Sequence, residues 1–120
     1  MHIEAVRNYC LAKKATTEEF PFDESTLVFK VMGKMYALVS LERTPLSINL
    51  KCDPERAIEL REEYPEEILS GYHMNKKHWN TVRLEESLDS HLIVEMIDHS
   101  YDLVVSKMTK KLRAELEALE

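Results

Sequence analysis

Two apolar runs separated by only two residues constrain the fold of this chain most. Residues 27–32 and 35–42 are rich in apolar and β-branched side chains, and Gly33 and Lys34 stand between them. A glycine at the first of two loop positions suits a type II′ turn of a β-hairpin. The pattern therefore predicts two antiparallel strands that are joined by a tight turn.

A third strand is indicated by clean alternation in residues 46–52. Leu46, Ile48, Leu50 and Cys52 fall on one face, and the residues between them are polar. This alternation is typical of a strand that buries one face and leaves the other in water. It predicts a sheet with one polar face.

The remaining elements are predicted from periodicity and from helix-capping signals. Helices are expected at residues 2–14, 54–64, 90–105 and 109–120, and further strands at residues 79–84 and, more briefly, 71–74. Residues 16–25 are expected to form a connecting loop pinned by Phe20 and Phe22, because Pro21 between them discourages a helix.

The order of these elements defines the fold class. Strands that are neighbours in sequence, with helices at both ends and in the middle, indicate an α+β fold with an antiparallel sheet and flanking helices. The expected order is α-β-β-β-α-β-β-α, followed by a C-terminal helix. The length of 120 residues and the hydrophobic content of 44% match one domain over residues 1–120.

Composition argues against several classes of function. With only 2 Gly in the chain, the glycine-rich loops that cradle phosphates in nucleotide-driven enzymes are nearly excluded. Cys10 and Cys52 lack the spacing of zinc or redox sites and are expected to be buried and reduced. No leader and no bilayer-spanning apolar run is visible. We therefore expect a cytoplasmic protein without a cofactor, a metal ion or a membrane partner.

Residues 71–83 are the most informative segment for function. They contain no acidic residue and three fixed cations, namely Lys76, Lys77 and Arg83. The whole chain has 16 Lys+Arg against 22 Asp+Glu, so 13 against 22 remain outside this segment. The contrast predicts a local anion site, at which Tyr72 and Trp79 could stack a base or a sugar beside the phosphate contacts.

Structural explanations compete with this functional one. The two lysines could belong to a solvated surface turn. Trp79 lies on the face opposite Val82 if the period of two holds, and becomes a core residue if the register breaks before it. The tripeptide Asp98-His99-Ser100 has the composition of a catalytic triad, but adjacent helical residues diverge by roughly 100°, so we exclude that role.

Three ordered motifs identify a resemblance to a known family. The motifs are residues 49–55, 71–80 and 97–104. Together they resemble the MmcQ/YjbR family of small bacterial proteins over nearly the whole chain. The resemblance implies a YjbR/CyaY-like fold in the order given above. It also implies DNA binding through a pair of sheet hairpins called a double wing, with the turn at Gly33 and Lys34 as one wing tip.

The first functional hypothesis is a non-enzymatic module that contacts DNA phosphates with low sequence specificity. The basic segment and the family motifs together assign this role to Lys51, Tyr72, Lys76, Lys77, His78, Trp79 and Arg83. Because the rest of the chain is acidic, the affinity should be modest and sensitive to salt.

Two other hypotheses remain open. The chain could bind a protein or peptide, or a second copy of itself, through an exposed sheet face or through Leu112, Leu116 and Leu119 of the C-terminal helix. An enzyme that acts on a small anion with His73 or His78 as the base is supported only by the presence of those histidines.

Overall fold

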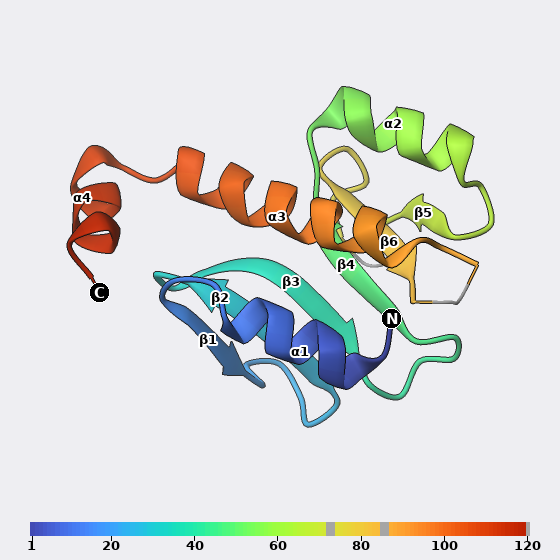
Figure 1. Ribbon diagram of the computed structural model, residues 1–120, viewed down its shortest axis with the longest axis horizontal. Coiled ribbons are helices and arrows are strands. Elements are labelled where there is room, and N and C mark those ends of the chain that lie inside the picture. The colour runs from blue at the N-terminus through green and yellow to red at the C-terminus, as the bar shows by residue number, and fades with distance from the viewer. Residues whose placement is uncertain (72–73, 85–86, 120) are drawn as a thin grey trace.

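A six-stranded antiparallel sheet with helices against one face forms the framework of the chain (Figure 1). The computed structural model describes residues 1–71, 74–84 and 87–119. The helices are α1 (Ile3–Leu11), α2 (Pro54–Glu63), α3 (Ser90–Ser106) and α4 (Lys110–Ala118). The strands are β1 (Thr16–Glu19), β2 (Thr26–Val31), β3 (Lys34–Ser40), β4 (Ser47–Lys51), β5 (Ile68–Ser70) and β6 (Trp79–Arg83). The predicted α+β class is confirmed.

The strands are arranged in the order β1-β2-β3-β4-β6-β5, and each neighbouring pair is antiparallel. The predicted β2–β3 hairpin is present, but its turn lies one residue earlier than expected. Val31 pairs with Lys34, so the loop residues are Met32 and Gly33. Their φ angles of 49° and 79° are both positive. Positive φ at both positions is the conformation of a type I′ turn, and Lys34 becomes the first residue of β3.

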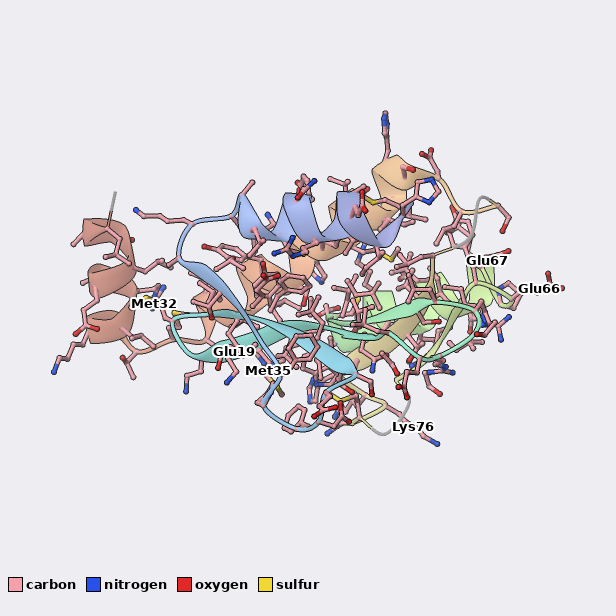
Figure 2. The ribbon with its side chains drawn as sticks, turned by 90° about the horizontal axis from the view of Figure 1, so that it is seen from below. Glu19, Met32, Met35, Glu66, Glu67 and Lys76 are labelled. Carbon is pink, nitrogen blue, oxygen red and sulfur yellow. The ribbon has the colours of Figure 1, made fainter. Side chains whose placement is uncertain are left out.

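The two faces of the sheet have different surroundings. Along β2, Leu27 and Phe29 belong to the main core beneath the helices, whereas Val28 belongs to a separate small cluster with Leu38 and Trp79. Successive side chains of a strand point to opposite faces, so this cluster lies on the face away from the helices. We call it the open face. Figure 2 shows α1 on one side of the sheet and Lys76 on the other.

The expected loop at residues 16–25 and its pinning by Phe20 and Phe22 are wrong. Residues 16–25 do not form a loop throughout, because β1 occupies the first four of them and pairs with β2. Phe20 and Phe22 do not pin this segment, since they are 51% and 63% exposed. The strand expected at residues 71–74 lies partly outside the described residues, and the strand that pairs with β6 is instead β5, which ends at Ser70.

The helix α2 begins where its predicted capping residue indicates. The Asp53 carboxylate accepts a hydrogen bond from the Arg56 amide (3.3 Å) at the start of α2. At the C-terminal helix, Leu116 is buried and Leu112 packs against the main core, while Leu119 is exposed. The apolar stripe of α4 therefore serves mainly to pack this helix on the rest of the chain. Within the described ranges, no helix is long and apolar enough to cross a bilayer.

Candidate nucleic-acid interface

β3 and β4 separate toward the tip of the β2–β3 hairpin. The described pairing of these strands covers only Ala37 to Val39 on β3. β4 ends at Lys51, and the amide of Cys52 donates a hydrogen bond to the carbonyl of His78 (2.8 Å) as the chain leaves for α2. An opening therefore lies between the hairpin and the end of β4.

The hydroxyl of Ser100 on α3 fixes the point at which the strands separate. Its Oγ accepts a hydrogen bond from the Lys51 amide (2.9 Å) and donates one to the Tyr36 carbonyl (2.5 Å). If the pairing of β3 with β4 continued by one more residue beyond Ala37 and Leu50, Lys51 would lie opposite Tyr36. The hydroxyl thus satisfies two backbone groups that would otherwise need partners in the ladder, and it sets the position of Lys51 relative to the hairpin.

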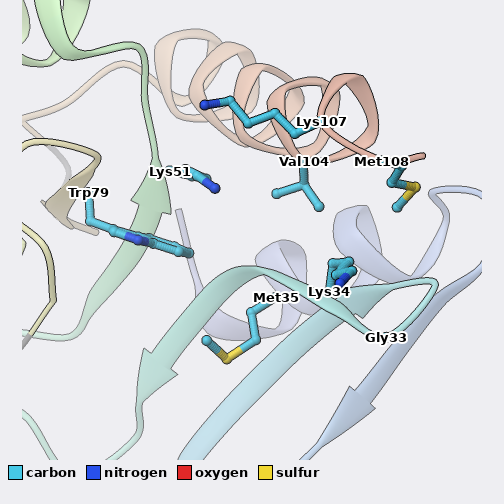
Figure 3. A pocket seen from close by; sticks show the side chains of 8 residues that line it. All are labelled: Gly33, Lys34, Met35, Lys51, Trp79, Val104, Lys107 and Met108. Carbon is cyan, nitrogen blue, oxygen red and sulfur yellow. The ribbon is translucent and has the colours of Figure 1, made fainter. Parts of the chain in front are cut away.

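A cavity of about 440 Å³ occupies this opening (Figure 3). Side chains from the hairpin, from the ends of β4 and β6 and from the end of α3 line it. These residues are Gly33, Lys34, Met35, Lys51, Trp79, Val104, Lys107 and Met108. We call this cavity the lysine pocket, because three of its eight lining residues are lysines and none is acidic.

The lining of the lysine pocket contains three lysine side chains and no acidic side chain to neutralise them. The pKa of Lys51 is lowered, first because the side chain is partly buried and second because the positive charge of Lys107 lies nearby. Both effects disfavour the charged ammonium. An anion placed between the lysines would offset the repulsion, so the geometry favours a negatively charged ligand. The indole of Trp79 and the thioether of Met35 add an apolar wall to the same cavity.

The structure brings together only part of the predicted site. Lys51 pairs with Trp79 across β4 and β6, and both line the lysine pocket. Arg83 does not join them, because it lies four residues along β6 from Trp79, or about 13 Å. Tyr72 lies outside the described residues.

The predicted residues of the loop before β6 lie near the pocket but do not line it. Lys76 and Lys77 are exposed, and His78 is half-buried. The loop is held by hydrogen bonds from the Arg61 guanidinium to the Lys76 carbonyl (3.0 Å) and from the Lys77 amide to the Asn75 side chain (2.9 Å). The two lysine side chains therefore add positive charge outside the lining of the pocket.

Trp79 combines the two alternatives that the sequence left open. The period of two is kept, so Trp79 lies on the face opposite Val82. It is nevertheless only 9% exposed, because Val28 and Leu38 pack against it on the open face. Gly71 leaves it room, since a Cβ added there would lie 2.8 Å from the Trp79 Cβ. Only part of the indole is available to a ligand.

Sequence reasoning missed most of the lysine pocket. Lys34 was assigned to a hairpin turn, the tip of one expected wing, but not to the phosphate-contacting residues. Lys107 was assigned no role, because it follows the last apolar residues of a helix far along the chain. Its position at the end of a strongly amphipathic helix was the one available clue. Only the packing of α3 across the sheet places it beside Lys51.

Other candidate catalytic groups do not converge. Asp98 accepts a hydrogen bond from the Tyr9 hydroxyl (2.6 Å), whereas the His99 ring accepts one from the Asp53 amide (3.2 Å). Ser100 is engaged with backbone groups, so these three side chains have different partners. Burial raises the pKa of Cys10 to about 12 and that of Cys52 to about 11. Among the described residues, no three His, Cys, Asp or Glu side chains are grouped to hold a metal ion.

Comparison with known proteins places this geometry in a family. The YjbR family model matches residues 11–103. The chain belongs to the YjbR family. The match includes β3, β4, β6 and most of α3, but it ends before Lys107 and Met108. The outer wall of the lysine pocket therefore lies beyond the matched segment.

Bacterial relatives agree with this assignment. The uncharacterized protein YbdF of Escherichia coli O157:H7 is 40% identical over 92 residues, which are 77% of this chain and 75% of that protein. The uncharacterized protein YjbR of Escherichia coli K12 is 30% identical over 113 residues, which are 94% and 95% of the two chains.

Solved structures share the fold. The crystal structure of a Deinococcus radiodurans protein with the DUF419 domain has a TM-score of 0.91 and 44% sequence identity, and the match covers 96% of this chain and 87% of that one. A Pseudomonas syringae protein has a TM-score of 0.71 and 28% identity, over 86% of this chain and 98% of that one. The predicted YjbR-like fold is confirmed.

Proposed function

We propose that this chain is a non-enzymatic nucleic-acid-binding module that contacts phosphates at the lysine pocket. The observation that carries the proposal is the convergence of Lys34, Lys51 and Lys107 on one cavity whose lining has no acidic residue. Lysine ammonium groups bind phosphate oxygens as point charges. Three of them around one opening provide a site for the backbone of a polyanion.

The loop before β6 supports a polymer over a single small anion. Lys76 and Lys77 are exposed two and three residues before Trp79, which itself lines the pocket. Positively charged side chains are therefore also present outside the pocket lining. A nucleic-acid strand has regularly spaced charges that can follow such a surface.

The net charge of the chain sets the expected strength of binding. A formal charge of -6 opposes the approach of DNA outside the local site. Contacts to about three phosphates would make the logarithm of the binding constant fall with the logarithm of salt concentration with a slope of about -2 to -3. Binding should therefore be measurable at low salt and weak near physiological salt.

The proposal is tested by fluorescence-anisotropy titration of labelled DNA across a salt series. We expect Lys51→Ala combined with Lys107→Ala to lower the affinity and to reduce the salt slope by about 2. The matched control, Lys14→Ala combined with Arg56→Ala, removes two positive charges that do not line the pocket. The control should bind within about two-fold of the wild type, in keeping with the small contribution of a distant charge.

A second variant separates the pocket from the loop. Lys76→Glu combined with Lys77→Glu should weaken binding. At saturating DNA, however, the fluorescence of Trp79, the single tryptophan of the chain, should be quenched as much as in the wild type. Absence of binding by the folded wild type at low salt would contradict the proposal. The rival proposal, a protein or peptide partner at the open face, would then be favoured by the exposure of Phe22, which lines a hollow on that face.

A further inference from the structure

The open face has a second cavity that the lysine pocket does not include. Its volume is about 340 Å³. Its lining comes from the β1–β2 loop, β3, β4 and the β5–β6 loop and includes Phe22, Asp23, Leu38, Ser40, Asn49 and Met74. We call it the aromatic hollow.

Phe22 is the unusual member of this lining. Its side chain is 63% exposed, although phenylalanine is one of the residues that proteins bury most often. Leu38 and Met74 provide further apolar surface in the same hollow. An aromatic ring that is open to solvent on the uncovered face of a sheet is the usual platform on which proteins stack an unpaired base.

Polar groups in the aromatic hollow suit the edge of a base. The Asn49 side chain accepts a hydrogen bond from the Thr81 hydroxyl (2.6 Å), which orients its amide. Ser40 adds a hydroxyl to the same lining. Amides and hydroxyls both donate to and accept from the hydrogen-bonding edges of nucleic-acid bases.

The aromatic hollow adjoins the lysine pocket. Asn49 lines the first and Lys51 lines the second, and they lie two residues apart on the same side of β4, a distance of about 7 Å. Leu38 of the hollow also packs with Trp79 of the pocket. An extended strand that placed a base in the hollow would therefore present a neighbouring phosphate to Lys51.

The negative charge of Asp23 favours an uncharged base over a phosphate in the aromatic hollow. Its carboxylate accepts hydrogen bonds from the amides of Ser25 (2.9 Å) and Thr26 (2.7 Å). The bond from Ser25 is the largest of the contributions that lower the pKa of Asp23, so the group is anionic at neutral pH. A phosphate would be repelled from this rim, whereas an uncharged base would not.

We infer that the ligand of the open face is single-stranded nucleic acid, with one unpaired base against Phe22 in the aromatic hollow and an adjoining phosphate at Lys51. The inference rests on the proposed function, because the lysine pocket supplies the attraction to phosphate. A duplex keeps its bases paired and stacked, so it cannot place one in the hollow without first unpairing it.

The test compares three labelled DNA probes with the same number of phosphates. The first is a single strand of about twelve nucleotides, which is within the usual site size. The second is the same strand with abasic sites throughout, and the third is a duplex. The wild type should bind the base-bearing single strand more tightly than the other two. Phe22→Ala should weaken binding of that probe by roughly five-fold to a hundred-fold, the measured range for one stacked base. Binding of the abasic strand should not change.

Phe20→Ala is the matched control. Phe20 lies in the same loop, is also half-exposed at 51% and does not line the hollow. Both variants should fold like the wild type, because neither side chain belongs to a core cluster. Circular dichroism checks this point before the titrations.

The outcomes separate the inference from the proposed function. Equal affinity of the wild type for the base-bearing and abasic strands would overturn the inference and leave phosphate binding at the lysine pocket intact. Equal losses for Phe20→Ala and Phe22→Ala would also overturn it. Failure to bind any of the probes at low salt would overturn the proposed function and the inference with it.

Discussion

Ser100 shows how one buried hydroxyl can shape a site without touching a ligand. It lies between the Lys51 amide and the Tyr36 carbonyl, at the point where β3 and β4 separate. A valine or alanine there would leave two buried backbone groups without this partner. The opening that forms the lysine pocket therefore depends on a residue that does not line it.

Replacement of this residue gives a prediction for stability. Ser100→Ala should lower the free energy of unfolding by about 1–3 kcal/mol, because it leaves the two backbone groups unpaired. Urea denaturation followed by tryptophan fluorescence measures the change. Ser106→Ala is the control, since the Ser106 hydroxyl donates only to the exposed end of the same helix, at the Leu103 carbonyl (2.7 Å). Losses of equal size in the two variants would contradict the prediction.

Single residues of the site were predictable where they obey local rules. The alternation of β4 placed Lys51 on the face opposite Leu50, and the period of two placed Trp79 opposite Val82. Neither pattern contains the separation of β3 from β4, because that separation depends on a serine from a distant helix. The sequence therefore identified two residues of the lysine pocket but could not predict Lys107 as their neighbour.

Four side chains join α1 to α3. The Lys13 ammonium lies 5.2 Å from the centre of the Tyr9 ring and 4.9 Å from that of Tyr101. It also forms an ion pair with Asp98 (2.5 Å), which accepts from the Tyr9 hydroxyl as well. Cation–π contacts and the ion pair reinforce one another where the end of α1, with Lys13 just beyond it, packs on the middle of α3.

This contact predicts the response of the helix pair to acid. Burial alone would raise the pKa of Asp98, but the hydrogen bonds from Lys13 and Tyr9 outweigh it and the pKa is lowered. The contribution of Asp98 to stability is therefore present when the pH is above its pKa in the unfolded chain, which is about 4. It is lost as the pH falls through the lower pKa of the folded protein. Asp98→Asn should be less stable than the wild type at pH 7, and the difference should shrink below about pH 4.

Chemical denaturation at several pH values measures this effect. The effect should be modest, because the Asp98 side chain is 41% exposed to screening solvent. Asp102→Asn, on the exposed side of the same helix, serves as the control and should not change the dependence on pH. A difference for Asp98→Asn that stayed constant down to pH 3 would show that the ion pair is not responsible.

Elements with strong periodicity were predicted well, and polar elements were not. α3 has a broad apolar stripe and was placed within one residue at its C-terminal end. β1 has the sequence Thr-Thr-Glu-Glu, which carries no apolar alternation because it is an edge strand with charged side chains. The hairpin turn was displaced because Met32 adopts a positive φ, which sequence patterns do not suggest for methionine.

At the scale of the whole molecule, the proposed nucleic-acid ligand would meet local attraction and global repulsion together. The formal charge of -6 surrounds a pocket of three lysines. The screening length falls from about 30 Å at 0.01 M salt to about 10 Å at 0.1 M. Added salt therefore first screens the distant acidic residues and only then the short contacts in the pocket.

This order predicts an unusual kinetic response. The association rate constant for DNA should change little, or rise, as salt increases through that range, while the dissociation rate constant increases steeply. Stopped-flow measurement of Trp79 fluorescence gives both constants. A steep fall of the association rate with salt would instead show that the pocket steers DNA from a distance, as strongly basic proteins do.

The uncovered face of the sheet has a consequence for encounters between identical molecules. Phe22 lines a hollow on that side and is exposed to water, and exposed apolar groups of this kind favour association when two such faces meet. Each copy, however, carries the same excess of negative charge, so copies repel one another before the faces can touch. The acidity that we expect to weaken DNA binding should thus also keep the protein colloidally stable, and that protection should diminish near its isoelectric point of about 5.4.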